Sequence, residues 1–329
     1  MPYDKLVLAT GSEALSFGRK PRGVFKLKTL ADADEILKHG GRKAVVVGAG
    51  PIGLEIGIAL LRLGARVTIL EKFDQVLPLG LDAPGAARVE KVLRDKGIEV
   101  ATGESCEEVL GADRLEGVTT DRRELGCDIL VWAVGMRPKS DLARQAGAQI
   151  GKRNWIRVNE RLETNLPDVY ACGDCVESPD ILTGEPYPNL FWHNARRQGA
   201  VVARNCAGLP TAYPGSQNLL NLDVFGNHVA GFGFTVSTLR QFRDIPAFTG
   251  QAMDPAVIEK EGAGSYFRLV ILGDRCWGGQ FINPGREIGL IWSLIQKKQQ
   301  IGPLREILAK KEWLQHHPWR ALRDFKKNS

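Results

Sequence analysis

The chain has 329 residues, of which 43% are hydrophobic and 25% charged, ordinary values for a globular protein with two or three domains. It has no 20–50-residue repeat and no low-complexity segment, and its most apolar stretch, 44–61, contains four glycines, a proline and a glutamate. We therefore expect no membrane span. The six cysteines are scattered and the first residues lack a basic start followed by a long apolar core, which favours a cytoplasmic protein with reduced thiols.

The first elements in chain order predict an α/β unit. A short strand leads into a glycine at residues 3–12, and residues 13–38 form a connector that ends in a helix. Apolar β-branched runs alternating with helical periodicity then predict a parallel sheet. The expected strands lie near 44–48, 67–71, 98–101 and 128–134, and the expected helices near 52–63 and 83–96.

Residues 44–72 indicate a dinucleotide site. A strand enters Gly48, Gly50 and Gly53 in G-x-G-x-x-G spacing, a helix follows, and a second strand ends at Glu71. The first glycine permits a tight turn, the second lets the backbone approach a pyrophosphate, and the third lets helix and strand pack closely. The phosphates are then expected at the positive end of the helix.

Glu71 also predicts which nicotinamide cofactor is used. Its carboxylate can accept hydrogen bonds from the adenosine ribose hydroxyls, and it repels the 2′-phosphate of NADP. Lys72 and Arg66 are close in sequence and could soften this preference without removing the carboxylate. We predict that NADH is preferred over NADPH.

A second informative block covers residues 156–177. Ile156, Val158 and Leu162 alternate as in a short hairpin, and a strand over 169–171 enters Gly173 and Asp174. An aspartate at the end of a buried strand, after a glycine, suits the binding of a cofactor hydroxyl. Two similar junctions between strand and glycine occur at residues 3–12 and 128–138.

These four ordered motifs resemble the pyridine nucleotide-disulfide oxidoreductases, flavoproteins that bind two dinucleotides. The resemblance covers residues 1 to about 210 and is greatest for rubredoxin reductases, the NADH-flavin part of nitrite reductases, and NADH oxidases. It implies a Rossmann-like NAD(H)-binding domain inserted in an incomplete FAD-binding domain, followed by a small α/β C-terminal domain. The implied ranges are 1–38 (partial FAD domain and connector), 39–137 (NAD(H) domain), 138–212 (FAD-domain return) and 213–329 (C-terminal domain).

The resemblance also implies the residues that hold the two cofactors. Asp174 would bind the FAD ribityl chain, Glu55 would lie near the nicotinamide, and a helix starting around 190–194 would point its N-terminus at the flavin. The residues expected at NAD(H) are Gly48, Gly50, Pro51, Ile52, Gly53, Glu55, Glu71, Lys72 and Gly135. Those expected at FAD are Ala9, Thr10, Gly11, Gly173, Asp174, Phe191, Trp192 and His193. No catalytic side chain is assigned, because the cofactors carry the chemistry.

One departure concerns the flavin. Family members start with a separate G-x-G-x-x-G about 100 residues before the strand at 3–12, and that segment also holds their redox cysteine pair when one is present. We therefore expect either a truncated chain or half of a flavoprotein completed by another polypeptide, and in either case an incomplete FAD site.

Other motifs have less specific interpretations. Cys172 and Cys175 are spaced C-x-x-C but have no second pair to complete a zinc site, so we interpret them as incidental. His317-Pro318 lacks the acidic residue that orients a catalytic histidine. Residues 297–329 hold nine basic and three acidic side chains, which account for the net charge of +6. This tail is either a solvated face or a docking surface for an acidic electron-transfer protein or partner subunit.

From residue 214 onward the pattern predicts strands at 219–234, 265–272 and 276–283, then helices near 285–299 and 303–315.

Two functional hypotheses remain for the whole chain. It is an NADH-dependent flavoenzyme that reduces an acceptor such as rubredoxin or a nitrite-reductase-type centre, with NADH oxidase or disulfide reductase as family alternatives. Otherwise it is an electron-input subunit that does not turn over alone. No nucleic-acid partner and no metal are expected, and a homodimer is compatible with the family.

Overall fold

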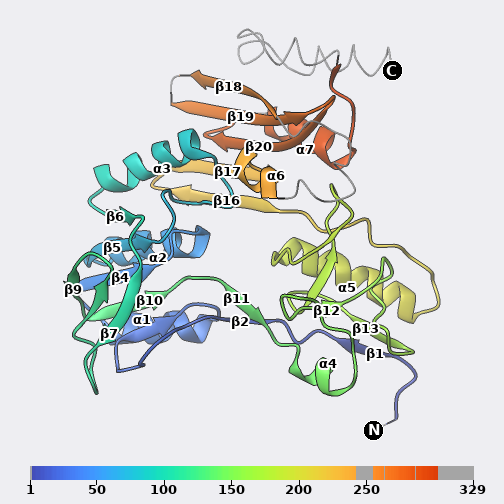
Figure 1. The fold of residues 1–329 in the computed structure, drawn as a ribbon, viewed down its shortest axis with the longest axis horizontal. Coiled ribbons are helices and arrows are strands. Elements are labelled where there is room, and N and C mark those ends of the chain that lie inside the picture. The colour runs from blue at the N-terminus through green and yellow to red at the C-terminus, as the bar shows by residue number, and fades with distance from the viewer. Residues whose placement is uncertain (1, 242–254, 263, 286, 303–329) are drawn as a thin grey trace.

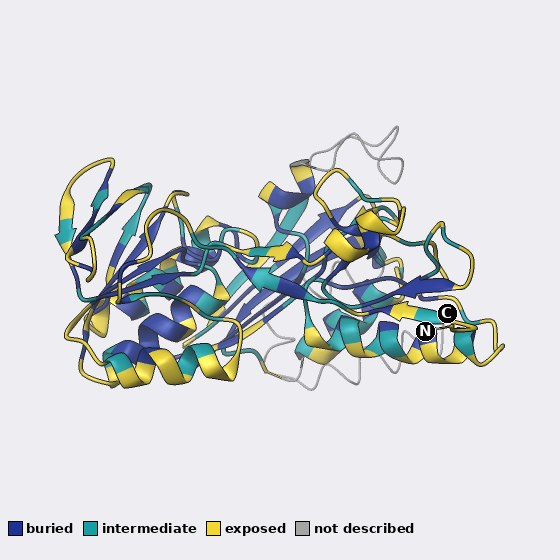
Figure 2. Ribbon diagram, turned by 90° about the horizontal axis from the view of Figure 1, so that it is seen from below, coloured by how far each residue is buried: buried dark blue, intermediate teal, exposed yellow. Residues whose placement is uncertain are grey.

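The computed structural model describes residues 2–241, 255–262, 264–285 and 287–302. Three lobes surround a central gap between ribbons in Figure 1, with the lobe that contains α2 and the lobe that contains α5 joined by a thin β2–β11 ribbon. The third lobe, built from β16–β20, lies across the other two. Figure 2 shows buried strands in the interior and helices whose outer faces are exposed.

The first lobe is a parallel sheet of five strands in the order β3-β10-β4-β5-β6. Its strands are β3 (Val24–Lys26), β4 (Lys43–Val47), β5 (Arg66–Glu71), β6 (Glu99–Thr102) and β10 (Ile129–Trp132), and its helices are α1 (Leu30–His39), α2 (Pro51–Arg62) and α3 (Ala83–Asp95). Val46 pairs with Ile69 and Val131, and all three side chains are fully buried. Such β-branched runs suit strands that are covered on both faces. The four predicted strands and the predicted helices of this lobe are confirmed to within a few residues, whereas β3 lies in a segment expected to be a connector and was not predicted.

A second, antiparallel sheet covers the other face of this lobe. It consists of β7 (Cys106–Leu110), β8 (Gly117–Thr120) and β9 (Glu124–Gly126). Val109 and Val118 are buried against Val45 and Leu70 of the parallel sheet. The sequence analysis missed these strands, because they are short and carry many charged residues, such as Glu107 and Glu108.

The second lobe contains β1 (Leu6–Leu8), β12 (Ile156–Arg157), β13 (Val169–Ala171), β14 (Val176–Pro179), β15 (Pro186–Tyr187), α4 (Asp141–Gln145) and α5 (Trp192–Cys206). Strand β1 pairs in parallel with β13, Leu8 opposite Ala171, so the two predicted glycine junctions lie side by side. The expected hairpin over 156–162 is wrong, because β12 pairs in parallel with β14 and Leu162 lies in a turn that begins at Asn159.

The chain passes between the first and second lobes twice, and the two connecting segments pair with each other. Strands β2 (Ser12–Ala14) and β11 (Met136–Pro138) pair antiparallel, Ser12 opposite Pro138. Lys139 N also donates a hydrogen bond of 2.9 Å to Gly11 O. The two crossing segments thus support one another at this junction.

The third lobe is an antiparallel sheet in the order β16-β17-β20-β19-β18. Its elements are β16 (Leu219–Val224), β17 (Asn227–Gly233), α6 (Val236–Gln241), β18 (Ala256–Gly262), β19 (Ser265–Leu272), β20 (Arg275–Ile282) and α7 (Glu287–Gln296). Strand β18 was not predicted, because its charged residues interrupt the apolar pattern that indicates a strand. The first predicted terminal helix corresponds to α7, whereas the second, near 303–315, and most of the basic tail lie outside the described residues.

The third lobe is tied to the first by a buried polar contact. Asp82, which precedes α3, accepts hydrogen bonds from Gln280 Nε2 at 2.7 Å and Arg268 Nε at 3.1 Å. Its own N–H donates to Gln280 Oε1 at 2.6 Å. A buried carboxylate with an ionic partner and several donors is satisfied, so this contact fixes the two lobes together. None of the described helices is long and apolar enough to span a membrane.

Candidate functional site

In the glycine-rich turn between β4 and α2, packing requires two of the three glycines to lack a side chain but does not require it of the third. A Cβ on Gly48 would lie 2.4 Å from Ala133 O, and a Cβ on Gly53 would lie 1.8 Å from Gly48 O. Gly48 also has a φ of +105°. A Cβ on Gly50 would meet no atom within 4 Å. No packing contact of the protein therefore requires Gly50 to lack a side chain, whereas the close approach of a pyrophosphate would.

Glu71 ends β5 beside this turn and is 6% exposed. One carboxylate oxygen accepts a hydrogen bond of 2.8 Å from Ala49 N, inside the glycine turn, and the other accepts 3.0 Å from Phe73 N. Each carboxylate oxygen can accept a further bond. Glu71 therefore holds the turn in shape and keeps acceptor capacity toward the adjoining cavity, a role in the turn that the sequence analysis did not foresee.

Gly135 and Glu55, two other residues expected at NAD(H), differ in whether they line the cavity. Gly135 follows β10 with a φ of +106°, and a Cβ there would meet no atom within 4 Å. Glu55 projects from the first half of α2, where desolvation raises the pKa of its carboxyl. Gly135 lines the cavity described below, whereas Glu55 does not.

The residues expected at the flavin gather around Asp174. Its Oδ2 accepts hydrogen bonds from Lys28 Nζ at 2.8 Å and from Ser12 Oγ at 2.9 Å, and Lys28 Nζ also lies 3.0 Å from Ser12 Oγ. Sequence analysis missed Lys28, because a single lysine before a helix carries no motif. The contact places a cation beside the predicted ribityl ligand.

Gly173, the residue before Asp174, is held in place by a hydrogen bond to α5. Gly173 N donates 2.7 Å to Oε1 of Gln198, a buried residue of α5. Gln198 Nε2 in turn donates to Ser178 Oγ at 3.0 Å and Ser216 Oγ at 3.1 Å. This fully satisfied network holds the Gly173–Asp174 turn against α5, and nothing in the spacing of the sequence signalled it.

Helix α5 begins at Trp192, as the resemblance implied. Trp192 is 77% exposed, whereas the ring of His193 stacks on Phe191 at 5.6 Å. His193 Nε2 is buried without a hydrogen-bond partner among the described residues, and burial lowers the pKa of its imidazole. An orphaned buried nitrogen at a helix N-terminus fits a site for a polar cofactor edge.

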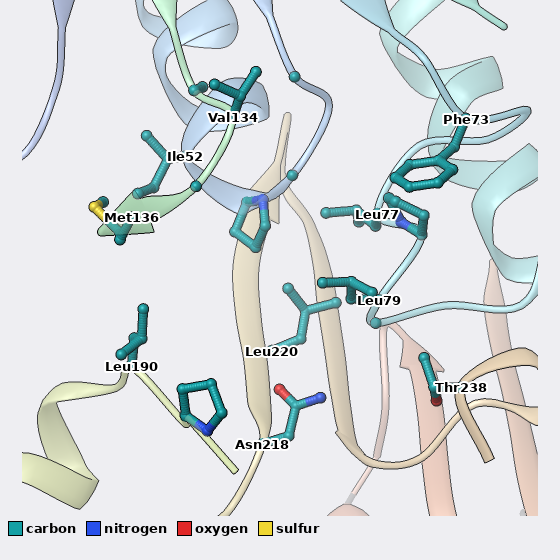
Figure 3. Close-up of a pocket in the computed structure, with 18 of the residues that line it drawn as sticks. Ile52, Phe73, Leu77, Leu79, Val134, Met136, Leu190, Asn218, Leu220 and Thr238 are labelled. Carbon is teal, nitrogen blue, oxygen red and sulfur yellow. The ribbon is translucent and has the colours of Figure 1, made fainter. Parts of the chain in front are cut away.

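A cavity of about 700 Å³ joins the three lobes. Figure 3 shows Ile52, Val134 and Met136 on one side, Leu77 and Leu79 on the other, and Leu190 and Asn218 below them. Of the predicted site residues, its walls include Gly48, Gly50, Pro51, Ile52, Glu71, Lys72, Gly135 and Phe191. The walls do not include Gly53, Glu55, Ala9, Thr10, Gly11, Gly173, Asp174, Trp192 and His193.

Cys172 and Cys175 are not bonded to each other in the structure. Both thiols are free and buried, and burial raises the pKa of Cys172 to about 11. A thiol with a raised pKa is a poor nucleophile at neutral pH. Among the described residues no three His, Cys, Asp or Glu side chains gather as metal ligands, and His317 lies outside those residues.

Comparison with known proteins extends these observations. An NADH oxidase of Methanocaldococcus jannaschii is 39% identical over 77% of this chain and 57% of its own length. The nitrite reductase [NAD(P)H] of Bacillus subtilis is 29% identical over 93% of this chain and 36% of its own length. The chain therefore spans little more than half of the first relative and about a third of the second.

Solved structures share the fold. An NAD-dependent persulfide reductase from A. fulgidus superposes with a TM-score of 0.84 at 30% identity, covering 92% of this chain and 58% of that one. A FAD-dependent pyridine nucleotide-disulphide oxidoreductase from Desulfovibrio vulgaris gives 0.82 at 28% identity, covering 94% and 81%. The family model described as pyridine nucleotide-disulphide oxidoreductase matches residues 1–199. The chain belongs to this family of oxidoreductases, whose cofactors are FAD and NAD(H).

Proposed function

We propose that this chain binds NADH along the glycine turn and Glu71, and that it delivers the electrons of NADH through FAD to a separate acceptor. The observation that carries the proposal is that Gly50 and Glu71 open onto the same cavity as Phe191, at the start of the helix expected to face the flavin. When bound, FAD would supply the capacity to take two electrons from NADH and release them to the acceptor.

The residues of the chain bind and orient the nucleotide. The free N–H groups at the start of α2 stabilise the pyrophosphate, and Gly50 leaves room for it. Glu71 orients the adenosine ribose while holding Ala49 N. The apolar walls, among them Ile52, Val134 and Leu190, exclude water from the nicotinamide end.

The flavin side rests on Asp174, Lys28 and α5. Asp174 would accept from ribityl hydroxyls, and the ion pair with Lys28 holds this carboxylate in place. The N-terminus of α5 and the neutral His193 would face the flavin and stabilise negative charge on its reduced form. Thr10 and Gly11 lie just before β2, in the segment that connects the second lobe to the first. Gly11 has a φ of +71° and open space around its Cα.

The acceptor is proposed to be a small redox protein such as rubredoxin or a nitrite-reductase-type centre, and a family alternative is direct reduction of oxygen or a disulfide. A second candidate is an input subunit that works only inside a larger assembly. It is favoured by the 29% identity to the assimilatory nitrate reductase electron transfer subunit of Bacillus subtilis, of which the chain covers 30%.

The test is to incubate the purified chain with FAD and NADH and to follow NADH oxidation with oxygen, a small dye or rubredoxin. Turnover with one FAD per chain supports the flavoenzyme. NADH binding without turnover, restored by a polypeptide that supplies the remaining FAD contacts, supports the input subunit. Failure to bind NADH contradicts both.

A further inference from the structure

The cavity has two ends of different chemistry, and the inference below rests on the proposed binding of NADH. Glu71 and Lys72 mark the adenosine end, and Gly48 and Gly50 mark the phosphates. An extended dinucleotide anchored there must run away from Glu71. The opposite side of the cavity, where Leu190 and Asn218 lie in Figure 3, is therefore where the nicotinamide ring would be received.

The nicotinamide end is built mainly from apolar side chains. Leu190 and Leu220 lie near Asn218 in Figure 3, and Ile52, Val134 and Met136 form the adjoining wall above Leu190. Such walls can pack on the ring, but they cannot recognise the carboxamide group, which carries one acceptor and two donor hydrogens. In a cavity with few polar groups, any free amide has a large effect on which ring is accepted.

Each of the other polar side chains near this end makes at least one normal hydrogen bond within the protein, although Gln217 Nε2 and Asn189 Oδ1 make none to the residues that the structure describes. Thr238 Oγ1 accepts 2.8 Å from Thr235 N and lies 2.9 Å from Thr235 Oγ1. Gln217 Oε1 accepts 2.9 Å from Gln296 Nε2. Asp180 accepts from two backbone N–H groups and from Asn189 Nδ2.

Asn218 has the least engaged amide of this group, because its single side-chain contact within the described residues is long. It precedes β16, and Figure 3 shows its amide directed into the cavity. Its Nδ2 makes one long contact of 3.4 Å with Gly233 O. Its Oδ1 accepts no hydrogen bond from the residues that the structure describes, so one acceptor and one donor hydrogen are available to a ligand.

We propose that Asn218 recognises the carboxamide of the nicotinamide by a reciprocal pair of hydrogen bonds. Asn218 Nδ2 donates to the carboxamide oxygen, and the carboxamide N–H donates to Asn218 Oδ1. This pair fixes the rotation of the nicotinamide ring, and with it the face that the ring presents to the flavin side. The residue determines specificity and orientation and takes no part in electron transfer.

The test measures binding rather than turnover, so it needs no flavin. Three ligands are titrated: NADH, ADP-ribose, which lacks the nicotinamide, and the reduced 3-acetylpyridine analogue of NADH, in which a methyl group replaces the carboxamide nitrogen. The variants are Asn218→Leu and, as a matched control, Asn221→Leu. Asn221 lies exposed in β16, three residues after Asn218, and contacts His228 outside the cavity.

We expect Asn218→Leu to weaken NADH binding about tenfold, as the loss of two ordinary hydrogen bonds implies, and to leave ADP-ribose unchanged. The wild type should prefer NADH over the acetylpyridine analogue, and the variant should lose that preference. Asn221→Leu should change neither.

Equal weakening of NADH and ADP-ribose by Asn218→Leu would show a structural role and overturn the inference, and so would an intact preference in the variant. If the wild type binds ADP-ribose and NADH equally, no group holds the carboxamide and the inference fails while the proposed nucleotide site stands. If the wild type binds none of the three ligands, the proposed function itself fails.

Discussion

Replacing Glu71 by alanine separates its two roles, cofactor selection and support of the glycine turn. The wild type should bind NADH at least about tenfold more tightly than NADPH, because the carboxylate accepts from the ribose and repels the 2′-phosphate. In Glu71→Ala that gap should narrow, mainly because NADH binds more weakly.

The structure adds a stability term to this prediction. The carboxylate accepts bonds of 2.8 Å from Ala49 N and 3.0 Å from Phe73 N. A hydrogen bond to a charged group contributes about 1.5–3 kcal/mol. Because water in the cavity can replace part of each bond, we expect Glu71→Ala to lower the free energy of unfolding by roughly 2–3 kcal/mol in total.

Fluorescence titration with NADH and NADPH gives the two affinities, and urea unfolding gives the stability. Glu71→Gln is the matched variant, since it keeps the shape but presents an amide N–H₂ to one of the two backbone donors. It should lose both affinity and stability. Equal wild-type affinities for the two cofactors, or a Glu71→Ala protein that is as stable as the wild type, would refute the reasoning.

Three further predictions concern the flavin side and the tail. The lowered pKa of His193 means that the unfolded state binds a proton more readily than the folded state. The contribution of His193 to the free energy of unfolding is therefore present above pH 6.5 and is lost as the pH falls below 6.5. In His193→Asn, the free energy of urea unfolding should depend less on pH across that range. Because the single G-x-G-x-x-G of residues 1–329 is assigned to NADH, these residues purified without added FAD should carry less than one FAD per chain, and a flavin spectrum at one FAD per chain under that condition would contradict this. If the basic tail docks an acidic acceptor, rising salt or charge reversal at Lys310, Lys311, Lys326 and Lys327 should slow reduction of that acceptor but not of a neutral dye.

Much of the nucleotide site could be predicted because its physics is local. The positive φ of Gly48 and the packing of Gly53 on Gly48 arise within a few residues, and their spacing is visible in the sequence, whereas the contact of Gly48 with Ala133 is long-range. The strands that became β1 and β13 were also predicted from their strand-to-glycine junctions, although their pairing with one another was not.

The parts that were missed depend on long-range contacts. Lys28 meets Asp174 across 146 positions of sequence, and Gln198 reaches Gly173 across 25. Neither side chain belongs to a local pattern, so only the folded chain reveals its partner. The wrong hairpin at 156–162 has the same origin, since apolar alternation indicates a strand but does not identify which strand pairs with it.

The most direct test of the account is the binding of NADH to Gly50→Val, measured by calorimetry beside urea unfolding. The φ of Gly50 is −72°, and a Cβ there would meet no protein atom within 4 Å. Because Gly50 is the N-cap of α2, where valine is less favourable than glycine, the free energy of unfolding should fall by about 1 kcal/mol and the protein should stay folded. The added side chain fills the space for the pyrophosphate and should weaken NADH binding by at least about tenfold. Wild-type affinity for NADH in a stably folded Gly50→Val protein would contradict the assignment of this turn as the nucleotide cradle.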